Sequence, residues 1–203
     1  MGDSIIATMD TYDQNIYAIG KGPSETRVSV SPDVLPLKNG VMITGYVTDI
    51  SAGTKDDTIA ARFPNGVPAV SDESQSGWML YVYKQFARPT NASGVEVTLS
   101  VLDANNNYRE IGKTTTNTDG FFKFSWAPDI EGDYTLYASF TGSAAYYPSH
   151  ALAAFNVGPA AQESTPVNIP PDNSATNIMY AAIGIIVAIF VAMAVAVLIL
   201  RKR

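Results

Sequence analysis

Up to residue 157 the chain alternates short apolar runs with polar turn residues, a pattern that predicts strands rather than helices. In the run at 132–140, Tyr134, Leu136 and Phe140 fall on one face and the intervening residues on the other, as in a half-buried strand. The predicted strands are 27–30, 41–49, 95–102, 109–115, 121–126, 132–140 and 152–157. Strands of this number and spacing predict an all-β Greek-key sandwich.

The segment 51–90 departs from this pattern, because it is too long for a sandwich loop and contains a helix signal. Trp78, Tyr81 and Val82 follow one another at the three- and four-residue spacings of an apolar helix stripe. Ser71 is the predicted N-cap of this helix. The sequence therefore predicts a sandwich with a helical insert.

The aromatic residues of this insert, Trp78, Tyr81 and Tyr83, have two interpretations. They form a contact surface for a partner, or they pack a helix against the sandwich. We favour packing, and keep the contact surface as a hypothesis.

The C-terminal pattern is different, because residues 179–200 carry no charged side chain. At about 1.5 Å per residue, this helix is long enough to cross a hydrocarbon core of about 30 Å. Tyr180 stands where an interfacial aromatic residue belongs. A buried core helix, the alternative, is typically about 11 to 12 residues long. The sequence therefore predicts a single transmembrane helix at 178–200.

The flanks of this helix predict its orientation in the cell membrane. The basic residues 201–203 form a predicted cytoplasmic tail, which places the preceding domain outside. Residues 158–177 are rich in proline and hydroxyl side chains, which predicts an extended stalk. Residues 1–21 show no export signal, so we expect a fragment of a longer precursor or tail-first insertion.

Small residues recur every four positions within the predicted span and would share one helix face. They are Gly184, Ala188, Ala192 and Ala196. This face predicts close packing with a second copy of the chain, although alanine is also common in such helices for other reasons. The expected partners are therefore the lipid bilayer and a second transmembrane helix.

The composition and charge of the chain exclude several classes of partner and of functional site. The net charge is −6 although the last three residues are basic, which excludes nucleic acid as a partner. The chain has no cysteine, which excludes disulfides, thiolate metal sites and a cysteine nucleophile. His150 is the single histidine, lacks catalytic or metal-ligand neighbours, and is predicted in an exposed loop. We expect no enzymatic activity and no cofactor or metal.

Oxygen-bearing side chains cluster at Asp103 and residues 105–107. They suit a calcium ion, or a hairpin turn stabilised by its own side chains, and we favour the turn. The acidic pairs at 56–57 and 72–73 are neighbours in sequence, without the opposed arrangement that acid and base work requires. We interpret both pairs as solvated surface.

Asn91, Ala92 and Ser93 form an N-glycosylation acceptor in a predicted extracellular loop. The triplet therefore predicts a site of modification. Asn91 is the residue that would carry the glycan.

Residues 26–157 contain GYVTD, then GVEVTLSVLD, EIGKTTTNTDGFFKFSWAP and GDYTLYASFTGSAAYYPS. This order resembles the immunoglobulin-like (Ig-like) repeats of archaeal and bacterial surface proteins. The resemblance implies an Ig-like Greek-key sandwich, from which only the insert at 51–90 departs.

The N-terminal stretch SIIATMDTYDQNIYAIGKGPS resembles the end of a blade of pyrroloquinoline-quinone-type β-propellers. Residues 1–25 are therefore interpreted as a partial propeller-like strand segment. The chain as a whole is similar to the C-terminal region of archaeal membrane-anchored surface proteins that join such a propeller to an Ig-like domain. A single partial blade cannot form a propeller, so the cofactor of the relatives does not transfer.

Two functional hypotheses follow from these patterns. The first is a non-enzymatic, membrane-anchored extracellular module for structural display or protein interaction. The second is an anchor subunit whose N-terminal strand completes the β-propeller of a partner sensor or quinoprotein-like enzyme. An enzyme in its own right is disfavoured, because no complete catalytic set is present.

Overall fold

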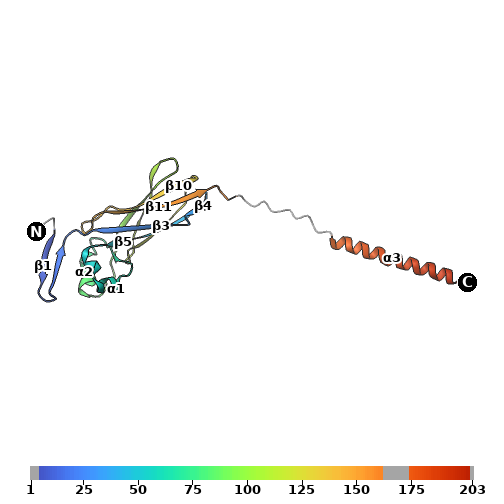
Figure 1. Ribbon diagram of the computed structural model, residues 1–203, viewed down its shortest axis with the longest axis horizontal. Helices are drawn as coiled ribbons and strands as arrows, with labels where there is room; N and C mark the ends of the chain where they lie inside the picture. Colours follow the sequence, from blue (N-terminus) through green and yellow to red (C-terminus); the bar gives the residue numbers. More distant parts are fainter. Residues whose placement is uncertain (1–4, 162–173, 202–203) are drawn as a thin grey trace. The chain divides into compact units, whose positions relative to one another are not determined.

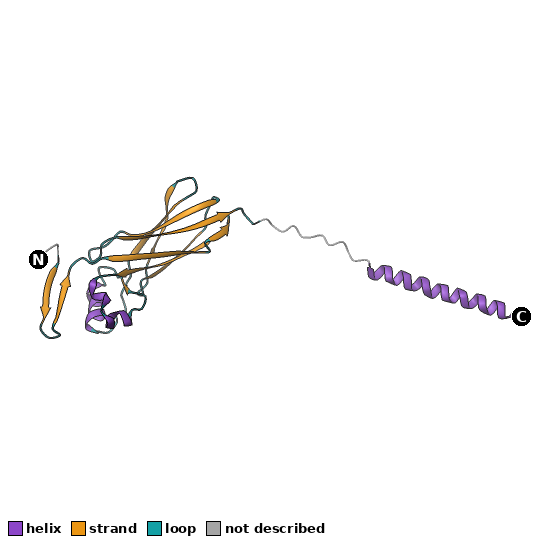
Figure 2. Ribbon diagram, viewed as in Figure 1, coloured by secondary structure: helices purple, strands orange, loops and turns teal. Residues whose placement is uncertain are grey.

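The computed structural model describes residues 5–161 and 174–201. The chain divides into two units, one up to Ala161 and one from Gln162 onward. The first unit is built mainly from strands, whereas the described part of the second is a helix (Figure 2). The strands are β1 (Ile6–Asp10), β2 (Asn15–Ile19), β3 (Ser24–Ser31), β4 (Val34–Pro36), β5 (Val41–Asp49), β6 (Val67–Pro68), β7 (Glu96–Leu102), β8 (Tyr108–Thr115), β9 (Phe121–Trp126), β10 (Gly132–Phe140) and β11 (Ser149–Gly158). The helices are η1 (Ala52–Lys55), α1 (Asp57–Arg62), α2 (Gln75–Lys84) and α3 (Ser174–Arg201).

Two sheets form the sandwich of the first unit (Figure 1). One has the strand order β4-β11-β10-β7-β8; in the other, β5 lies between β3 on one side and β9 and β6 on the other. The strands β3, β5 and β9 take the places of strands A, B and E of an Ig-like domain, and β7, β10 and β11 those of C, F and G. The chain is thus an Ig-like Greek-key sandwich, and the predicted fold class is confirmed.

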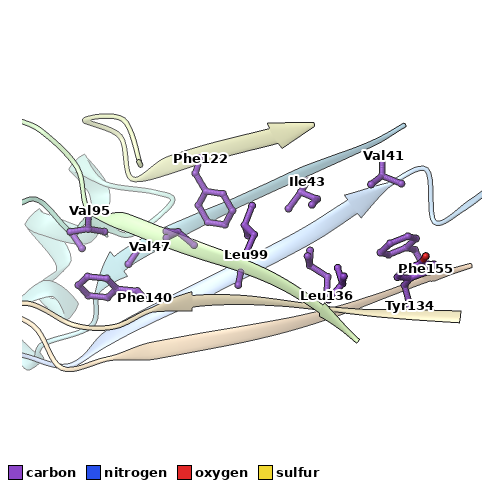
Figure 3. Packing of buried hydrophobic residues seen from close by; sticks show 14 of the residues in the cluster. Val41, Ile43, Val47, Val95, Leu99, Phe122, Tyr134, Leu136, Phe140 and Phe155 are labelled. Carbon is purple, nitrogen blue, oxygen red and sulfur yellow. The ribbon is translucent and has the colours of Figure 1, made fainter. Parts of the chain in front are cut away.

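The core lies between the two sheets, where inward-facing residues of β5 meet those of β10 (Figure 3). In β10, Tyr134, Leu136 and Phe140 are buried together with Ala138, as the alternation predicts. The facing side chains of β5 include Val41, Ile43 and Val47. Each large apolar side chain buried in this way stabilises the fold by about 1.5 to 3 kcal/mol.

Gly45 allows an aromatic ring to cross the middle of β5. A Cβ atom at this position would lie 2.4 Å from the Phe122 ring and 2.1 Å from the carbonyl oxygen of Arg27. Both distances are far inside van der Waals contact, so only glycine lets Phe122 pack here. The pairing of β5 with β9 depends on that close approach.

Tyr134 forms a tyrosine corner, a hallmark of Ig-like sandwiches. Its hydroxyl donates to the carbonyl oxygen of Ile130 at 3.2 Å and accepts from the Ile130 N–H at 3.3 Å. Its ring stacks on Phe155 at a centroid distance of 5.1 Å and meets Trp126 edge-on at 5.6 Å. The corner therefore fixes the loop that enters β10 and closes one end of the core.

Several strand boundaries differ from the prediction. The strand predicted at 27–30 extends over β3, and the strand predicted at 152–157 begins three residues earlier, as β11. His150 consequently lies on a strand rather than in a loop, although it is exposed as expected. The added residues are largely polar and belong to strands because neighbouring strands pair with them, which local alternation does not show.

The second unit contains α3, whose most apolar window has a mean hydropathy of 3.2. The helix is long and apolar enough to cross a membrane. It begins four residues before the predicted span, so 174–177 are helical rather than part of the stalk; no proline or glycine there opposes a helix. The rest of the predicted stalk at 162–173, and tail residues 202–203, lie outside the described residues.

Candidate functional site: the N-terminal hairpin and the insert

The insert between β5 and β7 has a hydrophobic core of its own. Its buried members are Ile59, Val67, Val70, Trp78 and Val82. Trp78 is fully buried, whereas Tyr81 and Tyr83 are half-buried. Trp78 is thus a core residue, and a partner would reach it only if the insert opened. Contact through Tyr81 and Tyr83 stays a prediction.

The start of α2 differs from the prediction. The helix begins at Gln75, with Ser74 rather than Ser71 at its N-cap position. The hydroxyl of Ser71 is instead 2.8 Å from the hydroxyl of Ser93, on the segment leading into β7. Ser71 therefore ties the segment before α2 to the segment that leads into β7, a long-range contact that the capping pattern could not reveal.

Two acidic side chains fasten the insert to the loops of the sandwich. The Asp72 carboxylate accepts the N–H groups of Ala144 at 2.8 Å and Ala145 at 3.0 Å, and the Ala144 hydrogen bond is the main reason that the pKa of Asp72 is lowered. Arg88 donates to the carboxylate of Asp119 at 2.6 Å. The insert is thereby attached to two separate loops of the sandwich.

The strands β1 and β2 form an antiparallel hairpin next to the insert (Figure 1). Ile6 pairs with Ile19 and Met9 pairs with Ile16. Most of these side chains face solvent: Met9 is 60% exposed and Ile16 is 76% exposed. The hairpin belongs to neither hydrophobic cluster of the described residues, and it presents its apolar side chains outward.

Lys84, at the end of α2, reaches the hairpin and binds its turn. Its Nζ atom donates to Asp10 Oδ2 at 2.6 Å and also to the carboxylate of Asp13. The same Nζ lies 4.3 Å from the centroid of the Tyr17 ring, whose hydroxyl donates to Asp13 at 2.6 Å. We call these four residues the lysine clamp.

The charges of the lysine clamp stabilise one another. The hydrogen bond from Lys84 lowers the pKa of Asp10 and of Asp13, and the two carboxylates raise the pKa of Lys84. All three side chains are partly exposed, so solvent screens much of their attraction. The clamp therefore orients the hairpin more than it stabilises the fold.

A second attachment lies between the hairpin and β3. The Gly22 N–H donates to the Ala145 carbonyl at 2.8 Å, and the Gly22 carbonyl accepts from the Tyr147 N–H at 2.8 Å. The chain is thus bound to the loop between β10 and β11 directly after the hairpin. With the lysine clamp, this fixes the hairpin at both its turn and its base.

Polar groups are buried where the insert packs against the sandwich. Asp49 is only 5% exposed, and this burial raises the pKa of its carboxyl. Burial also raises the pKa of Tyr83 to about 12 and raises that of Tyr146. Within the described residues, the Tyr146 hydroxyl and the Gln75 Oε1 atom have no hydrogen-bond partner.

The other predicted sites are structural or untested. Asp103 accepts the N–H groups of Asn105 and Asn107, both at 2.9 Å, and so stabilises the turn between β7 and β8 as favoured. Across residues 5–161 and 174–201, no group of three or more histidine, cysteine or acidic residues is placed to hold a metal. Asn91 is exposed in the loop before β7, and its glycosylation stays a prediction.

No family model matches the chain, and no curated protein matches it. A PKD domain of an M14-like peptidase from Thermoplasmatales archaeon SCGC AB-540-F20 is similar at 15% identity, over 70% of this chain and 99% of that one, with a TM-score of 0.33. The CARDB domain of a Pyrococcus furiosus protein is similar at 11% identity, over 71% of this chain and 98% of that one, with a TM-score of 0.34. The fold assignment rests on the strand order and the tyrosine corner of the chain itself.

Proposed function

We propose that this chain is a non-enzymatic, single-pass membrane protein whose Ig-like sandwich lies outside the cell and displays the N-terminal hairpin to other proteins. The observation that carries this proposal is the placement of the two chain exits on the sandwich. The hairpin precedes β3 at one end of the sandwich, and β11 ends at the other (Figure 1).

The hydrogen bonds of the sandwich define these two ends. Ser24, where β3 begins, lies 2.8 Å from Ser149 between hydroxyl oxygens, at the start of β11. Gly158, at the far end of β11, pairs with Pro36. The 10 residues of β11 span about 30 Å. In this proposal the sandwich is the spacer that joins the hairpin at one end to the chain that continues toward α3 at the other.

The proposed orientation follows from charge. Arg201 ends α3 and is followed by two more basic residues, which favours a cytoplasmic C-terminus and an external sandwich. A net negative charge and the lack of cysteine are compatible with an external module that relies on its core alone.

A second candidate function is favoured by the exposed hairpin. In this proposal the chain is the anchor subunit for a partner sensor or quinoprotein-like enzyme, and the hairpin completes that partner's β-propeller. Both candidates share the anchor and the spacer, and they differ only in what the hairpin contacts.

Membrane extraction tests the anchor. We expect the full chain to stay in the membrane pellet after alkaline carbonate treatment. A variant with Val187→Arg and Val191→Arg should appear in the supernatant, because each charge at the centre of a span costs about 2.5 to 3.5 kcal/mol. The matched control, Val34→Arg with Leu152→Arg on exposed positions of the sandwich, should stay in the pellet. Release of the unmodified chain would contradict the proposal.

A further inference from the structure

Asn91 lies in an exposed turn between the insert and β7. It begins the triplet Asn91, Ala92 and Ser93, and no other asparagine of the chain has a serine or threonine two positions later. Such a triplet, with a middle residue other than proline, is the acceptor for N-linked glycans on exported proteins. The sequence therefore offers one acceptor, and the structure shows how the fold presents it.

The fold leaves the side chain of Asn91 in solvent. Asn91 and the preceding Thr90 form the turn, and both are exposed. Within residues 5–161 and 174–201, no hydrogen bond or ion pair occupies the Asn91 amide. A glycan attached to this amide would extend into water and would displace no contact of the fold.

The chain on both sides of this turn is fixed. Before the turn, Arg88 is bound to the loop that leads into β9. After it, the Val95 N–H donates to the Thr116 hydroxyl at 2.9 Å, and Ala92 packs against the hydrophobic core of the insert. The exposure of Asn91 is therefore a feature of an ordered surface turn.

Ser93, the last residue of the triplet, also has a role in the fold. Its hydroxyl oxygen lies 2.8 Å from that of Ser71, and its N–H donates to the Ser74 hydroxyl at 2.9 Å. These contacts explain a serine at this position without any modification. No contact in the described part of the chain explains the asparagine at position 91 in the same way.

We propose that Asn91 carries an N-linked glycan. This inference rests on the proposed function, because an external sandwich passes the enzymes that modify exported chains. In the transfer, Asn91 Nδ2 forms a bond to the anomeric carbon of a sugar carried on a lipid phosphate. The bond from that carbon to the phosphate oxygen breaks, and the proton lost by the amide passes to the leaving lipid phosphate.

Mass spectrometry of the full chain, purified from its native membranes, tests the proposal. The tryptic peptide of residues 85–109 contains the complete triplet. We expect this peptide to be heavier than its sequence by the mass of a glycan, with fragment ions that place the added mass at Asn91. A peptide found only at the mass of its sequence would overturn the proposal.

Matched variants separate the acceptor from the structural role of Ser93. Asn91→Gln and Ser93→Ala should both abolish the added mass, whereas Ser93→Thr should retain it because threonine keeps the hydroxyl. The control is Asn65→Gln, at another exposed asparagine of the insert that no serine or threonine follows at the second position. It should leave the added mass unchanged. Added mass that persists in Asn91→Gln would contradict the assignment.

Cysteine labelling distinguishes a failure of this inference from a failure of the proposed function. Ser125 is exposed on β9, so a membrane-impermeant maleimide reaches Ser125→Cys on intact cells only if the sandwich is external. Labelling at 125 without a glycan on Asn91 would overturn this inference and leave the proposed function standing. Protection at 125 together with an unmodified Asn91 would overturn both.

Discussion

At the scale of single residues, Lys84 provides the side-chain attachment of the hairpin to the insert. It joins two carboxylates of the hairpin turn to the end of α2, while most other contacts of the hairpin are internal. Lys84 and Asp10 are 74 residues apart in sequence, so no local pattern links them. The sequence could not predict this contact, because each residue alone resembles an ordinary solvated charge.

Replacing Lys84 with methionine should release the hairpin and leave the sandwich intact. We expect faster backbone hydrogen exchange at 6–10 and 15–19, and unchanged exchange across β10. The matched control is Lys113→Met on β8, which removes an exposed ion pair with Glu96 on β7. Equal exchange in the two variants would contradict the role of the lysine clamp.

The protection of the hairpin from hydrogen exchange is also expected to depend on pH, and to fall only in acid. The folded-state pKa of Asp10 and of Asp13 is lowered by Lys84, so the contribution of the lysine clamp is fully present above the unfolded value of about 3.9. It is lost as the pH falls through the lower folded-state values. We expect hairpin protection to be constant from about pH 7 down to about pH 4 and to fall only in stronger acid. Loss of protection between about pH 7 and 5 would point to a different contact.

Tyr134 provides a residue-scale test of the fold. Tyr134→Phe keeps the ring stack on Phe155 but removes the hydroxyl that binds the Ile130 backbone. We expect a loss of about 0.5 to 1.5 kcal/mol in the free energy of unfolding, because the part-buried backbone groups of Ile130 lose their hydrogen-bond partner. Tyr137→Phe, a half-buried position on the other face of β10, should change it by less than about 0.5 kcal/mol. Denaturant unfolding compares the two, and equal losses would argue against the corner.

At the scale of elements, the long strands with an alternating pattern were predictable from the sequence. Strands that are short, or that form only because a neighbouring strand pairs with them, were not. The predicted bounds of β5, β9 and β10 match the structure, because each has an alternating pattern and flanking turn residues. The strand β4 has three residues and exists because it pairs in parallel with the end of β11. The predicted cap of α2 at Ser71 is wrong, because the hydroxyls of Ser71 and Ser74 both bind the distant Ser93 and the helix begins only after Ser74.

The insert and the hairpin form one functional element although they are far apart in sequence. The insert was predicted as a helical departure from the sandwich, and its helix α2 provides the lysine that orients the hairpin. Trp78 is buried in the insert core, which packs α2 against the rest of the insert. A contact role of Trp78 stays a prediction.

At the scale of the whole molecule, the chain contains an N-terminal hairpin, an Ig-like sandwich and an apolar helix. The start of β3 and the end of β11 are separated by about the length of one strand of the sheet. We propose that the sandwich lies outside the cell while the C-terminal end of α3 reaches the cytoplasm.

Cysteine labelling on intact cells tests this claim most directly, because the chain has no cysteine of its own. Ser125→Cys places a thiol on an exposed position of β9, and Arg203→Cys places one after the helix while keeping two basic residues. We predict that a membrane-impermeant maleimide labels the variant at 125 on intact cells, and the variant at 203 only after the cells are permeabilised. Labelling at 203 on intact cells, with protection at 125, would contradict the account.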